Sequence, residues 1–255
     1  MEVSLLRRGE ADAAISLWSR VFGDRPQDVR RVFDAAGLAE TTVAAREAWR
    51  LVSMMCAFNG IRRGGMTISY VCALATEPDF RGRGAASAVL RAITQNCFAS
   101  GADAVCLHPA DTSLARWYAE AFGMTPLGSF DYAELPLNGA AADVSELTGA
   151  QYAERTTAAV SAELACAAAV YGSRFFECAG GCFTVSPRGE TALVCSLPPD
   201  CAPAAVSACR ALGCRRAIVR HSAAFAEGKE VSVLAAASGV DIIEELKKLS
   251  FPVLL

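Results

Sequence analysis

The first third of the chain changes from helical to strand-like spacing of its apolar residues. Residues 10–37 carry apolar side chains at helical intervals, with a stop at Gly23 and a helix-starting Pro26, and predict two helices. A short strand at residues 5–6 is expected to precede them. Three apolar segments separated by turn residues predict three further strands: residues 42–45, 51–58 and 66–76.

The next part of the chain alternates helices and strands. An amphipathic helix is expected from about residue 85 to a stop at Gly101, and a buried strand at residues 104–107. A further helix runs from about Thr112 to Gly123, and strand-like segments follow over residues 127–137. A strand, helix and strand in this order predict a right-handed parallel crossover.

The second half begins after a small, polar stretch at Asn138–Ser145, which we interpret as a linker. The predicted domains are residues 1–138 and 148–255, with the linker at 139–147. Within the second domain the pattern predicts helices at 151–171, 202–212 and 241–249 and strands at 181–185, 191–197, 216–220 and 231–235. This hairpin, helix and strand order repeats the order of the first half.

Composition narrows the class of protein. The chain has 255 residues, 53% of them apolar, which suffices for one large core or two modest ones. A formal net charge of −3 gives no electrostatic reason to expect nucleic acid or an anionic membrane as a partner. The N-terminus lacks the order of a signal peptide, and the longest uncharged run, residues 64–76, is too short to span a bilayer. We therefore expect a soluble, cytoplasmic protein.

The cysteines, eleven in number, resemble neither a disulfide framework nor a zinc site. The closest pairs, Cys178/Cys182 and Cys209/Cys214, lack Cys-x-x-Cys spacing, and the two histidines do not complete a zinc pattern. Most cysteines lie in apolar runs. We expect them to be reduced, buried and small hydrophobic residues, and we expect no metal.

The most informative segment is the compact turn between the strand at 66–76 and the helix after it. Its string Arg81-Gly82-Arg83-Gly84 joins a strand to a helix N-terminus, an arrangement that binds phosphate groups through backbone N–H groups. A plain polar turn is the alternative interpretation. An RNA-binding Arg-Gly element is less favoured, because such elements lie in basic, low-complexity surroundings.

The string from Leu74 to Ala86 resembles the acetyl-CoA signature of the GCN5-related N-acetyltransferase (GNAT) superfamily. That signature is an Arg-x-x-Gly-x-Ala/Gly turn preceded by a strand and by a proline three residues before the arginine. Arg81 and Gly84 lie at signature positions, as does Ala86, and Pro78 lies at the proline. The resemblance covers roughly the first half of the chain. It implies an α/β (α+β) fold: a mixed central sheet with splayed parallel strands, flanked by helices.

The resemblance also implies which residues hold acetyl-CoA. Backbone amides of residues 82–87 would bind the pyrophosphate, Arg81 and Arg83 would add charge, and the splayed strand would expose amides to the thioester. The alternative interpretation of Arg81 is a structural role, because in this family the signature arginine can also stabilise the turn. The expected cofactor-binding residues are Leu74, Ala75, Thr76, Arg81, Gly82, Arg83, Gly84, Ala85, Ala86, Ser87 and Asp111.

Three residues are candidates for catalysis by the same resemblance. The backbone amide of Leu74 would act as a one-donor oxyanion hole, and Tyr118 would protonate the leaving thiolate. Tyr118 lies five residues before Gly123, one more than the commonest family spacing, so a tyrosine packed on the sheet with a surface hydroxyl is the alternative. His108 is the candidate base, with Glu77 the other ionisable group nearby; a surface histidine and proton removal through water remain open.

The function predicted from the sequence is direct transfer of an acyl group from acetyl-CoA to a primary amine of unknown identity. The acceptor would be a small molecule or a peptide, and the oligomeric state is left open. The alternative is a non-catalytic acyl-CoA-binding or regulatory module. In the second half Leu197-Pro198-Pro199-Asp200 replaces the signature turn, which suggests a smaller, degenerate GNAT-like domain; an unrelated small α/β domain is the other possibility.

Overall fold

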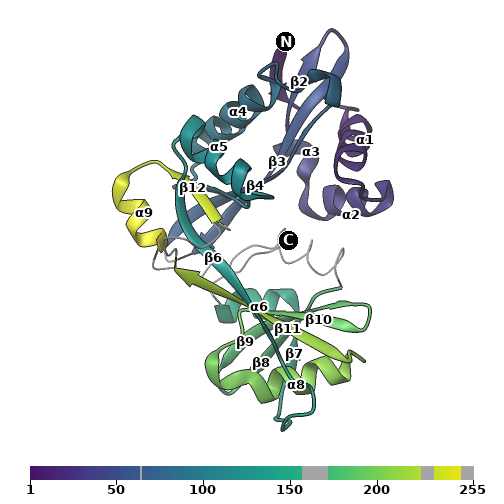
Figure 1. The fold of residues 1–255 in the computed structure, drawn as a ribbon, viewed down its shortest axis with the longest axis vertical. Coiled ribbons are helices and arrows are strands. Elements are labelled where there is room, and N and C mark those ends of the chain that lie inside the picture. Colours follow the sequence, from purple (N-terminus) through teal and green to yellow (C-terminus); the bar gives the residue numbers. More distant parts are fainter. Residues whose placement is uncertain (64, 157–171, 225–232, 248–255) are drawn as a thin grey trace. The chain divides into compact units, whose positions relative to one another are not determined.

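The computed structural model describes residues 1–63, 65–156, 172–224 and 233–247 (Figure 1). The chain divides into two compact units. Met1–Leu127 and Val231–Leu246 form the first unit, and the second unit contains Gly128–Glu230. Each unit is described separately below.

The first unit combines a mixed sheet with helices on both faces. Its strands are β1 (Glu2–Leu5), β2 (Val43–Glu47), β3 (Arg50–Arg63), β4 (Met66–Thr76), β5 (Ala104–Leu107) and β12 (Val233–Ala237). Its helices are α1 (Ala11–Phe22), α2 (Pro26–Ala36), α3 (Leu38–Thr41), α4 (Ala85–Ala99), α5 (Thr112–Phe122) and α9 (Val240–Lys247), with a 3-10 helix η1 (Pro78–Phe80). The helices and strands predicted for residues 1–123 are confirmed, with ends shifted by a few residues.

The sheet of the first unit follows the order β1-β2-β3-β4-β5-β12. Its neighbouring strands are antiparallel except β4 and β5, which are parallel and joined through α4. Figure 1 shows α4 and α5 on one face of β2–β4 and α1–α3 on the other. The predicted crossover therefore places one helix, α4, directly after the strand that carries the candidate site.

The core of the first unit forms where α4 and α5 meet the sheet. The apolar stripe of α4 is fully buried: Val89, Leu90, Ile93 and Cys97. Each of the three aliphatic side chains, Val89, Leu90 and Ile93, contributes roughly 1.5–3 kcal/mol on burial, so this face holds α4 on the sheet. The N-terminus of α4 is thereby held at a constant position beside the end of β4.

A buried ionic network fastens the start of the chain to β2. Arg46 is only 1% exposed and donates bidentately to the Glu10 carboxylate, as well as to the carbonyls of Ala44 and Leu5. Hydrogen bonds from Arg46 lower the pKa of Glu10 to about 2 although burial opposes this. Both groups therefore stay charged at neutral pH, and the network fixes the N-terminal strand and the start of α1.

The second unit repeats the sheet-and-helix pattern on a smaller scale. Its described elements are β6 (Thr125–Glu134), β7 (Ser145–Leu147), α6 (Gly149–Thr156), β8 (Arg174–Cys178), β9 (Gly181–Arg188), β10 (Thr191–Cys195), η2 (Pro199–Cys201), α8 (Ala202–Ala211) and β11 (Arg216–Ala224). The strand order is β6-β11-β10-β9-β8-β7. The sequence pattern missed β7 and β8, and most of the predicted helix 151–171 lies outside the described residues.

The two compact units do not follow the predicted boundaries. Strand β12 and helix α9 were expected within the domain at 148–255, yet both belong to the first unit. There β12 pairs antiparallel with β5, placing Leu234 opposite Leu107. A local apolar pattern predicts a strand but not its partner, and here the partner lies far away in the sequence.

The cysteine prediction is wrong for one pair. Cys178 of β8 and Cys201 of η2 form a disulfide, with their Cα atoms 6.7 Å apart. Most of the other described cysteines are buried and free, as expected: Cys56, Cys97, Cys106, Cys195, Cys209 and Cys214. The pair was missed because its members are 23 residues apart and approach each other only in the folded unit. Cys166 lies outside the described residues.

Candidate active site

Strand β4 carries a bulge in the middle of the candidate site. Between the register pairs Met54–Ala75 and Cys56–Cys72, β4 has one residue more than β3. Ala73 lies within this bulge with φ of 55°, a left-handed conformation. For a residue other than glycine this conformation costs roughly 1–2 kcal/mol. A bulge changes the direction of the strand and the orientation of its backbone groups. This bulge lies shortly before the turn.

Beyond the middle of β4 the two parallel strands separate. Their pairing covers Ile68–Tyr70 of β4, although β4 continues to Thr76. The Glu77 N–H donates to the Val52 carbonyl of β3 at 2.9 Å. Because backbone groups alternate along a strand, the Thr76 N–H points away from β3, toward the side where β5 no longer pairs. The predicted splay is present, and it leaves this amide facing a gap in the ladder. Leu74 lies within the bulge, and its role as an oxyanion donor stays a prediction.

The turn after β4 adopts a conformation that favours glycine. Gly82 has φ of 73° and Gly84 has φ of 81°, both left-handed. A Cβ atom added at either position would meet no atom within 4 Å. Backbone conformation rather than crowding therefore requires glycine here, and the space in front of the turn is open.

Helix α4 begins at this turn without a side-chain cap. Gly84 is the N-cap residue, and its carbonyl accepts the first helical bond from the Ala88 N–H at 3.0 Å. The N–H groups of residues 85–87 consequently have no partner inside the helix. The helix dipole adds roughly half a positive charge at this end. Together these groups form a site for an anion that approaches the turn from outside.

The two arginines of the turn have different surroundings. Arg81 Nε donates to the Thr76 carbonyl at 3.3 Å, which braces the turn against the end of β4. This contact favours the structural alternative for Arg81. Arg83 instead places its guanidinium over the Phe80 ring, 5.1 Å from the centroid, and Arg50 lies over the same ring at 5.5 Å.

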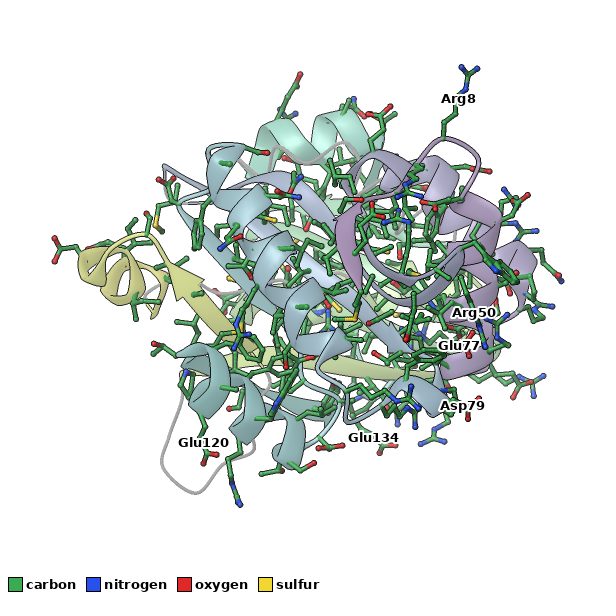
Figure 2. The ribbon with its side chains drawn as sticks, turned by 90° about the horizontal axis from the view of Figure 1, so that it is seen from above. Arg8, Arg50, Glu77, Asp79, Glu120 and Glu134 are labelled. Atoms are coloured by element: carbon green, nitrogen blue, oxygen red, sulfur yellow. A yellow bond between two sulfur atoms is a disulfide. The ribbon has the colours of Figure 1, made fainter. Side chains whose placement is uncertain are left out.

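Glu77 is held by two arginines and is not a free base. It is 5% exposed and pairs with Arg20 of α1 at 2.5 Å and with Arg50 of β3 at 3.2 Å. Figure 2 shows Arg50 and Glu77 beside each other. Burial by itself raises the pKa of Glu77, but hydrogen bonds from both arginines outweigh it and the pKa is lowered. Glu77 therefore remains a carboxylate that links α1, β3 and the turn.

The family comparison covers this region. Residues 2–123 match the family model described as acetyltransferase (GNAT) domain, which includes β4, the turn and both α4 and α5. This part of the chain is a GNAT acetyltransferase domain. No curated protein sequence matches the chain.

Solved structures show that the GNAT fold extends over more than nine tenths of the chain. A GCN5-related N-acetyltransferase from Anabaena variabilis superposes with a TM-score of 0.69 at 11% identity, covering 94% of this chain and 73% of that one. The corresponding protein from Kribbella flavida gives 0.66 at 14% identity, covering 92% and 70%. A tandem GNAT protein from the clavulanic acid biosynthesis pathway gives 0.56 at 13% identity, covering 93% and 99%. The predicted fold class and the second GNAT-like half are confirmed.

The second half of the tandem lacks the features of the GNAT site. Its parallel strands β10 and β11 stay paired along all of Thr191–Cys195, without a splay. Helix α8 starts after η2 rather than after a glycine turn, and Cys201 at this point is bonded to Cys178. In the second unit the parallel strands thus stay paired where those of the GNAT domain separate. Among the described residues there is therefore one candidate site.

Tyr118 of α5 points into the core of the GNAT domain. It is 6% exposed and shares one apolar cluster with Leu107 of β5 and with the partly buried Leu74. Burial raises the pKa of Tyr118 to about 12. No described residue forms a hydrogen bond with its hydroxyl. The unusual spacing before Gly123 therefore does not turn the ring away from the sheet.

His108 lies directly after β5 at the start of the splay. Its ring centroid is 5.3 Å from that of Tyr70, the last β4 residue paired with β5. The imidazole is half-buried and thus borders the separating strands. This position keeps His108 among the candidates for proton transfer.

Asp111 has a structural role as the N-cap of α5. Its carboxylate accepts hydrogen bonds from the Ser113 hydroxyl at 2.6 Å and from the Leu114 N–H at 2.9 Å. These bonds lower the pKa of Asp111, and the side chain is exposed. The cap explains why Asp111 follows β5, and its predicted contact with the cofactor stays a prediction.

Ala73, Phe80 and Arg50 are parts of the site that sequence reasoning missed. Alanine is not a signal for a left-handed bulge, so nothing in the local sequence marked Ala73. Arg50 reaches the turn only because β3 runs antiparallel to β4, which brings its start beside the end of β4. For Phe80 the only signal in the sequence was its position as an aromatic residue immediately before the arginine turn.

Among the described residues, no three His, Cys, Asp or Glu side chains gather in a way that would hold a metal ion. None of the described helices is long and apolar enough to span a membrane.

Proposed function

We propose that the chain is an acetyl-CoA-dependent N-acetyltransferase that transfers an acyl group directly to a primary amine. One observation carries the proposal: β4 opens away from β5, and then ends in a left-handed glycine turn on an uncapped helix. The backbone amides of β4 would pair with the extended thioester arm, and the amides of the turn and helix N-terminus would bind the diphosphate. No other described segment combines these features.

The residues of the turn fit the phosphate end of acetyl-CoA. The N–H groups of residues 85–87 lack helical partners, and the space beside Gly82 and Gly84 is open. These amides would hold the pyrophosphate. The Thr76 N–H on the open side of β4 would continue strand-like pairing with the pantetheine arm. When bound, acetyl-CoA supplies the activated acyl group.

The chemistry requires one oxyanion donor and two proton transfers. The amine nitrogen bonds to the thioester carbonyl carbon, the carbon–sulfur bond breaks, the nitrogen loses a proton and the sulfur gains one. The Leu74 N–H would stabilise the negative charge that develops on the carbonyl oxygen. Tyr118 would supply the proton to sulfur, since a pKa of about 12 keeps its phenol protonated at neutral pH. His108, or a water molecule, would accept the proton of the amine.

A second candidate function is a binding module that keeps acyl-CoA without turning it over. The observation in its favour is Tyr118, whose ring fills the apolar cluster as an ordinary core residue would. Calorimetry with acetyl-CoA, followed by thiol release over a panel of primary amines and peptides, separates the two functions. Binding with turnover on an amine supports the transferase, and binding without turnover on any amine supports the module.

The placement of the donor is tested at Gly84. We expect Gly84→Glu to weaken acetyl-CoA binding by at least about tenfold more than Gly84→Ala, because both share the backbone strain and only glutamate adds a negative charge. Titration calorimetry of both variants measures this. Equal affinity in the two variants would contradict the proposed position of the phosphates, and no binding by the unmodified protein would overturn both functions.

A further inference from the structure

The Phe80 ring beside the turn holds two guanidinium groups. Arg83 comes from the turn itself, 5.1 Å from the ring centroid, and Arg50 comes from the first residue of β3, at 5.5 Å. Stacking on a shared ring fixes the position of two long side chains that would otherwise be mobile. Two cations therefore lie over the ring of the residue that directly precedes the turn.

The charges around this ring are not balanced. On or next to η1 lie four arginines and two carboxylates: Arg20, Arg50, Arg81, Arg83, Glu77 and Asp79. Figure 2 shows Asp79 on the same edge as Arg50 and Glu77. Glu77 is shared by Arg20 and Arg50, and Arg83 forms no ion pair with any described residue. Because Arg50 shares one carboxylate with Arg20 and Arg83 has none among the described residues, positive charge remains around this ring and favours a bound anion.

The backbone amides and the arginine pair suit different phosphates. Amides at a helix N-terminus bind a diphosphate that lies against the turn. Side chains that extend outward from the turn reach a more distant group, and guanidinium groups bind the terminal oxygens of a phosphate monoester with two hydrogen bonds each. Coenzyme A carries such a monoester at its 3′ position. A clamp of this kind would distinguish it from its 3′-dephospho form.

We propose that Arg50 and Arg83, positioned by Phe80, form a clamp for the 3′-phosphate of the acyl-CoA donor. The clamp rests on the proposed function, because it assumes that acetyl-CoA binds at this turn. It makes the β2–β3 end of the GNAT domain part of the donor site. It also makes the 3′-phosphate a determinant of donor choice.

Calorimetry with acetyl-CoA and acetyl-3′-dephospho-CoA tests the clamp. We expect the unmodified protein to bind acetyl-CoA about tenfold or more tightly than the dephospho form. Arg50→Gln and Arg83→Gln should each reduce this ratio to about threefold or less, and the double variant to about one. Phe80→Leu keeps every charge but removes the ring, and should also lower the ratio. High salt should reduce the ratio in the unmodified protein.

Arg20→Gln is the matched control. Arg20 also pairs with Glu77 and has a similar exposure to Arg50, 56% against 48%, but its guanidinium does not stack on the Phe80 ring. The ratio should remain about tenfold in this variant. Equal affinity of the unmodified protein for both donors, or an equal fall in Arg20→Gln and Arg50→Gln, would overturn the clamp and leave the proposed function intact. Failure to bind either donor would overturn the proposed function as well.

Discussion

At the scale of single residues, the hydroxyl of Tyr118 is the group on which the proposed chemistry depends most. We expect Tyr118→Phe to lower kcat by about 10²–10⁴, the usual contribution of a positioned general acid. The Kd for acetyl-CoA should change by less than about twofold, because phenylalanine fills the same space in the apolar cluster. Thiol release and calorimetry measure the two effects.

The pH dependence gives an independent check on the same residue. An ordinary tyrosine titrates near pH 10, whereas burial raises the pKa of Tyr118 to about 12. The phenol of Tyr118 therefore stays protonated as the pH rises through about 10. We expect kcat not to fall in this pH range through loss of the Tyr118 proton. Tyr132→Phe is the control, since that side chain is 62% exposed and lies in the other unit. Full kcat in Tyr118→Phe would show that Tyr118 is not the acid and that another group or water protonates the thiolate.

At the scale of elements, the bulge of β4 aims the amide that would act as the oxyanion donor. Ala73→Val places a β-branched residue at φ of 55°, which costs on the order of 2 kcal/mol and shifts the backbone at Leu74. We expect a fall in kcat of about tenfold and a lower Tm. Thiol release and thermal unfolding followed by circular dichroism measure these changes.

Ala73→Gly is the matched control for the bulge. Glycine adopts the left-handed conformation without strain, so kcat should stay within about twofold and the free energy of unfolding within about 1 kcal/mol. Equal loss of kcat in both variants would show that the methyl group of Ala73, and not the backbone, is what the site requires.

The same scale shows what local pattern predicts well. The strand at 104–107 and the helix over Thr112–Phe122 were expected at nearly their observed limits, because apolar periodicity and the stop at Gly123 are local signals. The turn was expected for the same reason, since two glycines mark it. The bulge was not, because register depends on the neighbouring strand rather than on alanine.

At the scale of the whole molecule, the GNAT domain is completed by a strand from the end of the chain. Leu234 of β12 is fully buried in the cluster that contains Tyr118 and Leu107. We expect Leu234→Ala to destabilise the first unit by about 2–5 kcal/mol. Hydrogen exchange should show faster exchange of the β5 amides at Ala104–Leu107, although the substitution lies more than a hundred residues later in the chain.

Val194→Ala provides the comparison for this experiment. Val194 is equally buried, in β10 of the second unit. Its loss should increase exchange in β9–β11 and leave β5 protected. Unchanged protection of β5 in Leu234→Ala would contradict the pairing of β12 with β5.

The sequence by itself determined the order of helices and strands, the glycine turn and the likeness to GNAT proteins, because each is encoded in neighbouring residues. Tertiary structure decided which distant segments meet. It paired β12 with β5, linked Cys178 to Cys201, and brought Arg50 and Arg83 onto one ring. These contacts join residues far apart in the chain, and only the packing of the sheets and helices fixes which of many possible partners each residue finds.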